Sequence, residues 1–96
     1  MRSIVVSMQN MLLSEAVART LAETGEFRVE QVLPGKTSDT FSLCQAMQAD
    51  ILLMEVSRLP AYTLENRLNL IACVRKVMPS CKFVLLCDEN VDPELA

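Results

Sequence analysis

Histidine is absent from this 96-residue sequence, and glycine occurs only twice. Without histidine the chain lacks the most common general base and metal ligand, which excludes Cys–His zinc sites and Ser–His or Cys–His catalysis. With only Gly25 and Gly35, no loop can bring backbone amides around a phosphate as Gly-rich nucleotide-binding loops do. The sequence therefore predicts a protein that is not an enzyme.

Clusters of basic residues and long apolar runs are also missing. The 9 Lys and Arg residues are outnumbered by 12 Asp and Glu, so no face can neutralise several phosphates at once. The N-terminus leads into only three consecutive apolar residues. A signal-peptide core needs roughly 7–15, and a bilayer-spanning helix needs about 18. We therefore expect this segment to bind neither nucleic acid nor membrane directly.

The four cysteines form no C-x-x-C pair, and each lies in or beside an apolar segment. They are Cys44, Cys73, Cys81 and Cys87. We interpret them as buried, reduced thiols, which predicts a cytoplasmic protein.

The chain is rich in apolar residues, which make up 51% of it, whereas charged residues make up only 22%. A chain of this length buries only about 60–65% of its unfolded surface, so such a composition favours one small domain with an apolar core. The six methionines are interpreted as core residues.

Short apolar runs alternate with segments of helical periodicity. Strands are predicted over residues 4–7, 27–33, 51–54 and 83–86, and helices between Asn10 and Gly25, from the cap residues 37–39 to Asp50, and over 63–78. The alternation predicts βαβ units and a parallel sheet with right-handed crossovers. Polar residues dilute the second strand, which favours an edge position, whereas the unbroken apolar run 51–54 is typical of a central strand.

The helix over residues 63–78 has the clearest amphipathic pattern. Its predicted inward face is Leu64, Leu68, Ile71, Val74 and Met78, with Arg67, Arg75 and Lys76 pointing elsewhere. Pro79 stops it. Residues 92–94 form a second helix start, Asp-Pro-Glu, yet the chain ends at Ala96. We therefore expect residues 1–96 to be a single domain that is incomplete at its C-terminus.

Two stretches resemble a known family. Residues 49–56, followed by Leu59 and Pro60, are similar to the central strand of bacterial response-regulator receiver domains, which ends in a phosphoaccepting Asp. Residues 78–87 resemble the next helix end and strand of that family, whose last position is a switch Thr or Ser. The resemblance covers nearly the whole chain. It implies a flavodoxin-like, three-layer α/β sandwich with strand order 2-1-3-4 and the last βα unit missing.

The chain departs from the family at its functional positions. The phosphoacceptor position holds Glu55, with one residue more than usual before Pro60, and the switch position holds Cys87. The two acidic Mg²⁺-binding positions align with Met8 and Gln9. A thioether and an amide are poor substitutes for carboxylates around this hard cation. The resemblance therefore implies a lost metal site and no cofactor.

Each of these residues has two interpretations. Glu55 is either a fixed charge that imitates phosphorylation or, as we favour here, a solvated acid that has lost its role. Cys87 either makes a weak S–H contact in place of the Thr hydroxyl or, more simply, is a buried small hydrophobe. Asp88 and Glu89 with Glu55 either bind a cation or, as is usual for loop acids, remain solvated.

The function implied by the resemblance is that of an atypical receiver domain acting through protein–protein contacts. Its expected partners are a second copy of itself and a downstream output domain or regulatory protein that controls transcription, without conventional Asp phosphorylation. One alternative is a phosphotransfer-system IIB-like carrier, whose nucleophile after the first strand would be Ser7. Another is a purely structural dimerisation module.

Overall fold

The strands of the sheet lie where the apolar runs of the sequence predict them. The computed structural model describes residues 1–87, in which four parallel strands form one sheet in the order β2-β1-β3-β4. The elements are β1 (Arg2–Ser7), α1 (Met11–Glu23), β2 (Phe27–Val32), η1 (Pro34–Asp39), α2 (Thr40–Met47), β3 (Ile51–Val56), η2 (Pro60–Tyr62), α3 (Leu64–Val77) and β4 (Lys82–Cys87). The predicted α/β class and strand order are confirmed, and both are consistent with a flavodoxin-like fold.

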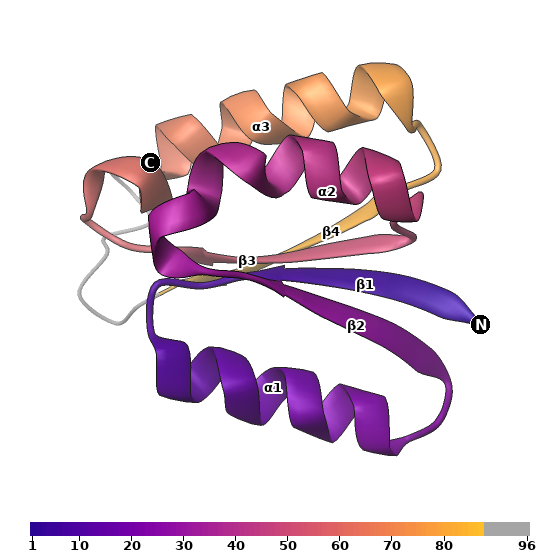
Figure 1. Cartoon of the computed structure of the whole chain (residues 1–96). Helices are drawn as coiled ribbons and strands as arrows, with labels where there is room; N and C mark the ends of the chain where they lie inside the picture. The colour runs from indigo at the N-terminus through magenta and orange to yellow at the C-terminus, as the bar shows by residue number, and fades with distance from the viewer. Residues whose placement is uncertain (88–96) are drawn as a thin grey trace.

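Three layers build the domain, with α1 on one face of the sheet and α2 and α3 on the other (Figure 1). Successive side chains of a strand point to opposite faces, so the two inner strands supply two separate apolar clusters. Ile4 and Val6 of β1 face α1, whereas Val5 of β1 and Leu52 and Met54 of β3 belong to the larger cluster beneath α2 and α3. Both inner strands are therefore covered on both sides.

The first helix begins and ends as its flanking residues predict. The Asn10 side chain accepts a hydrogen bond from the Leu13 N–H at 3.1 Å and so caps α1. Gly25 follows the helix with φ of +76°, a left-handed conformation that favours glycine. Val17 and Leu21 pack half-buried against the sheet, but Leu13, predicted on the same face, is exposed.

The predicted strand positions are confirmed as well. The edge strand β2 pairs with β1, and β3 lies between β1 and β4. The predictions for Asp88, Glu89 and the helix start at 92–94 lie outside the described residues. Among the helices of residues 1–87, none combines the length and apolar character needed to cross a membrane.

The inward face of α3 differs from the prediction. Leu68, predicted to face the core, is 50% exposed, whereas Arg67, predicted to point elsewhere, is only 2% exposed. Arg67 replaces Leu68 because the spacing 64, 67, 71, 74 follows the helical period as well as 64, 68, 71 does. The apolar character of Leu68 favoured Leu68 over Arg67 for the inward position. Arg67 occupies it instead, because the ends of β1 and β3 offer oxygen acceptors for its guanidinium.

The cysteines also divide differently from the prediction. Cys44 of α2 and Cys81, just before β4, are buried, as expected. Cys73 of α3 and Cys87 at the end of β4 are exposed, so the prediction that all four thiols are buried is wrong for these two. An apolar neighbourhood in sequence did not ensure burial, because Cys73 lies on the exposed side of α3 and Cys87 is the last residue of β4.

Candidate functional site

The carboxyl ends of β1 and β3 form the topological switch point of the sheet. The chain leaves β1 for α1 on one face, and it leaves β3 for η2 and α3 on the other (Figure 1). In open parallel sheets, ligand sites form where neighbouring connections diverge in this way. The loop after β1 and the end of β3 hold three of the site residues predicted from sequence, Met8, Gln9 and Glu55.

Glu55 reaches from the end of β3 to the start of α1. Its Oε1 atom accepts a hydrogen bond from the Gln9 backbone N–H at 2.7 Å and a longer one from the Asn10 N–H at 3.4 Å. A helix N-terminus carries partial positive charge and unpaired N–H groups, so it stabilises a carboxylate placed there. Glu55 is therefore bound by backbone groups rather than merely solvated.

The two positions that the resemblance assigns to acidic residues lie beside this contact but point apart. Met8 is fully buried in the cluster beneath α1, whereas the side chain of Gln9 is exposed. Glu55 is therefore the one carboxylate among these three residues. Within the described part of the chain, no cluster of three or more Cys, Asp or Glu residues is arranged to hold a metal ion.

Arg67 crosses the same strand ends from the opposite face. Its Nε donates to the Glu55 carbonyl oxygen at 2.9 Å, and its Nη2 donates to the Ser7 carbonyl oxygen at 2.9 Å. A third hydrogen bond runs from Nη1 to the Ser7 Oγ at 3.1 Å. All three acceptors are neutral oxygens, and together they join the end of β1, the end of β3 and the first turns of α3.

The turn before α3 positions Arg67. The Ser57 N–H donates to the Tyr62 carbonyl at 2.9 Å, which holds η2 against the end of β3, and Thr63 then caps α3 by accepting from the Asn66 N–H at 3.3 Å. The guanidinium carbon of Arg67 lies 4.6 Å from the centre of the Tyr62 ring, within the range of a cation–π contact.

Burial is the largest influence on the pKa values of Arg67 and Tyr62. Desolvation lowers the pKa of Arg67, and the nearby Tyr62 and Glu55 act in the opposite direction. Arg67 remains a cation, because a guanidinium is not deprotonated in proteins. Burial also raises the pKa of Tyr62, opposed by Arg67, and the Tyr62 hydroxyl has no hydrogen-bond partner among residues 1–87. The site therefore contains a buried positive charge a short distance from the Glu55 carboxylate.

The other two predicted residues are placed differently. The register places Leu86 of β4 beside Glu55, and Cys87 lies one position further along, beside Val56. Cys87 is exposed, which contradicts its interpretation as a buried hydrophobe. Ser7 is fully buried beneath Arg67 and lacks the accessibility of a nucleophile.

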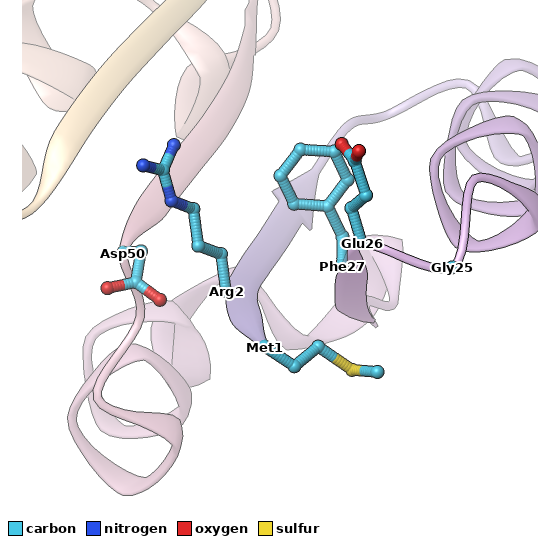
Figure 2. A pocket seen from close by; sticks show the side chains of 6 residues that line it. All are labelled: Met1, Arg2, Gly25, Glu26, Phe27 and Asp50. Atoms are coloured by element: carbon cyan, nitrogen blue, oxygen red, sulfur yellow. The ribbon is translucent and has the colours of Figure 1, made fainter.

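A separate cavity of about 810 Å³ opens at the amino ends of the strands, remote from Glu55. Figure 2 shows Arg2 and Asp50 on one side of it and Phe27 and Glu26 next to each other on the opposite side. Asp50 Oδ2 accepts a hydrogen bond from the Ser3 N–H at 2.7 Å, which joins the start of β3 to β1. Asp50 therefore has a structural role, which is to hold the starts of β1 and β3 together.

The chain matches no family model, no curated protein and no solved structure. The functional argument therefore depends on the contacts of Glu55 and Arg67.

Proposed function

We propose that the chain is a regulatory module of signal transduction, an atypical receiver-like domain that acts through protein–protein contacts without phosphorylation of an acidic residue. The proposal includes self-association and control of a downstream output domain. Its setting would be the cytoplasm, where the exposed thiols Cys73 and Cys87 stay reduced. The observation that carries the proposal is the hydrogen bonding of the Glu55 carboxylate to the start of α1.

Phosphoryl transfer to a carboxylate needs a free oxygen nucleophile and a cation that neutralises the phosphate charge. The Gln9 and Asn10 amides both donate to Glu55 Oε1, which leaves Oε2 as the oxygen that could attack, so the cation is the deciding requirement. Mg²⁺ prefers carboxylate and other oxygen ligands, yet Met8 is buried as a thioether and Gln9 offers only an amide. The lack of carboxylates at positions 8 and 9 therefore weighs against phosphorylation at this position.

The same contacts support a constitutive role for the Glu55 charge. The carboxylate links β3 to α1, and Arg67 links the Glu55 and Ser7 carbonyls to α3. A solvated relic of a phosphoacceptor would not account for the two bonds to backbone N–H groups. We infer that Glu55 holds the switch point in one arrangement that partners can recognise.

The carrier alternative requires Ser7 to attack a phosphoryl group. The burial of Ser7, and its contact with Arg67 at 3.1 Å, give that alternative no support.

The test is incubation of the 96-residue chain with acetyl phosphate and Mg²⁺, followed by intact-protein mass spectrometry. We expect the mass to stay that of the unmodified chain, while a conventional receiver domain treated in parallel gains a phosphoryl group. One stoichiometric acyl phosphate on this chain, lost in Glu55→Gln, would overturn the proposal.

A further inference from the structure

The outer edge of β2 is an edge of the sheet far from the point where the described residues end. Within residues 1–87, β2 pairs with β1 alone. The last described strand, β4, lies at the opposite edge, three strand positions away. The outward N–H and C=O groups of an edge strand are able to pair with another chain. The side chains of β2 therefore decide what can pair with this edge.

Two charges of opposite sign lie on one face of β2. Arg28 and Glu30 are two residues apart, both are exposed, and Glu30 lies beside Val5 of β1. Because Val5 belongs to the cluster beneath α2 and α3, both charged side chains are on that face of the sheet. Charges normally protect an edge strand, since like charges meet when two edges pair. Alternating signs remove this protection where each charge meets its opposite.

We propose that a second copy of this chain pairs with the outer edge of β2, antiparallel, about a two-fold axis that passes beside Val29. The two sheets would then form one continuous sheet. A two-fold axis perpendicular to the sheet keeps each face on its own side, so residues of like parity lie opposite each other. Arg28 would lie opposite Glu30 of the partner subunit, and the symmetry repeats this pair. Val29 would lie opposite Val29 of the partner subunit on the other face.

Charge complementarity selects this register and favours a second copy over other occupants. With the axis at Val29, each arginine meets a glutamate. Moving the axis by one residue places Arg28 opposite Arg28 of the partner subunit, or Glu30 opposite Glu30 of the partner subunit. Opposite charges directly across a strand pair stabilise it, whereas like charges destabilise it. An unrelated strand would need a glutamate and an arginine at the matching positions, which a second copy supplies by symmetry.

The α1 face of the pairing is apolar at its centre. Ile4 lies beside Val29 in the register of β1 and β2, and both belong to the cluster beneath α1. The row across the dimer would run from Ile4 through Val29 to Val29 and Ile4 of the partner subunit. This row extends the apolar cluster across the axis and removes β-branched surface from water.

The helix α1 leaves room for its partner. It packs on β1 and β2, so the two copies of α1 would lie about two strand spacings, or roughly 10 Å, apart, which is a normal distance between packed helices (Figure 1). The Ser14 Oγ donates to the Gln31 Oε1 at 2.9 Å, so this side of α1 faces β2. Ala18 and Ala22 follow Ser14 at four-residue spacing on the same side. Their small side chains allow a second helix to approach.

This inference rests on the self-association in the proposed function and deepens it, because it names the surface through which two copies would meet. It depends on the β2 edge and not on the absence of phosphorylation. The two tests therefore fail separately: a monomer overturns the dimer alone, whereas an acyl phosphate on Glu55 overturns the unphosphorylated mechanism alone.

The oligomeric state of the 96-residue chain tests the proposal by sedimentation velocity over a range of concentrations. We expect a reversible dimer for the native chain. Arg28→Glu leaves β2 with two acidic residues and Glu30→Arg leaves it with two basic ones, so like charges meet twice in each dimer. Each change should raise the dissociation constant at least about tenfold. The matched controls are Lys76→Glu and Glu65→Arg, which make the same changes in charge at exposed positions of α3.

Mixing the two variants tests the pairing of the charges. Arg28→Glu chains should form a heterodimer with Glu30→Arg chains, because each acidic position then meets a basic one. The double variant Arg28→Glu/Glu30→Arg should recover the homodimer for the same reason. Far-UV circular dichroism shows whether each variant remains folded; where a single variant does not, the native chain and the double variant decide. A monomeric native chain, single variants that dimerise as well as the controls, or folded single variants that fail to pair with each other would each overturn the proposal.

Discussion

Replacing Arg67 by Met keeps much of the apolar stem but removes the guanidinium that joins three elements. The change deletes three hydrogen bonds and leaves two backbone carbonyls and the Ser7 hydroxyl without their donor. An unsatisfied buried polar group costs about 1–3 kcal/mol, and the released desolvation penalty of the buried cation offsets part of that sum. We therefore expect the free energy of unfolding to fall by about 3 kcal/mol.

Urea unfolding followed by far-UV circular dichroism measures this loss. With a slope of about 2 kcal/mol per molar urea, the expected shift lowers the midpoint by about 1.5 M. The control is Arg19→Met on the exposed side of α1, which should change stability by no more than about 0.5 kcal/mol. Arg67→Lys should recover only a fraction of the loss, because an ammonium cannot reproduce the planar fork. If Arg67→Met were no more destabilising than Arg19→Met, the structural role assigned to the guanidinium would be wrong.

Three further outcomes follow from the described contacts. Ellman's reagent at pH 8 should rapidly modify the exposed Cys73 and Cys87, and denaturant should expose two more thiols; four fast thiols in the native chain would contradict the described burial. Burial raises the pKa of the Cys44 thiol from 9.0 to about 12. Between these two values the unfolded chain has lost the thiol proton while the folded chain keeps it. The free energy of unfolding should therefore fall by about 1.4 kcal/mol per pH unit from about pH 9 to about pH 12. Urea unfolding at pH 8 and pH 10 checks this, with Cys44→Ala as the reference that lacks the effect. Glu55→Gln should lower the free energy of unfolding by about 0.5–1 kcal/mol, because it removes the anion at the start of α1. Glu15→Gln, on the exposed side of α1, should lower it by less. Equal losses in thermal unfolding would count against the contact between Glu55 and α1.

Local patterns predicted most of the fold correctly. The apolar runs indicated all four described strands, and Asn10 and Gly25 marked the two ends of α1. These signals depend on neighbours in sequence, since capping and period-two or helical spacing act over a few residues. The alternation of strands and helices then restricted the topology to a parallel sheet, because right-handed crossovers leave few other arrangements.

The site was predicted only in part. The resemblance to receiver domains directed attention to Glu55, Met8 and Gln9, which lie at neighbouring ends of β1 and β3, where Glu55 contacts the Gln9 backbone N–H while Met8 points into the core. It gave no indication of Arg67, although the helical spacing of residues 64, 67, 71 and 74 was compatible with burial. The apolar neighbourhood of Cys87 predicted a buried thiol, but Cys87 is exposed.

The sequence by itself determined which segments are strands and helices, where α1 begins, and that the sheet is parallel. Only the tertiary structure decided what Glu55 and Arg67 contact, because their partners lie 46 and 60 residues away in the chain. Such partners depend on strand register and on which helix covers each face. At the switch point, a one-residue shift of β3 would replace Glu55 by Val56, and a one-residue rotation of α3 would replace Arg67 by Leu68.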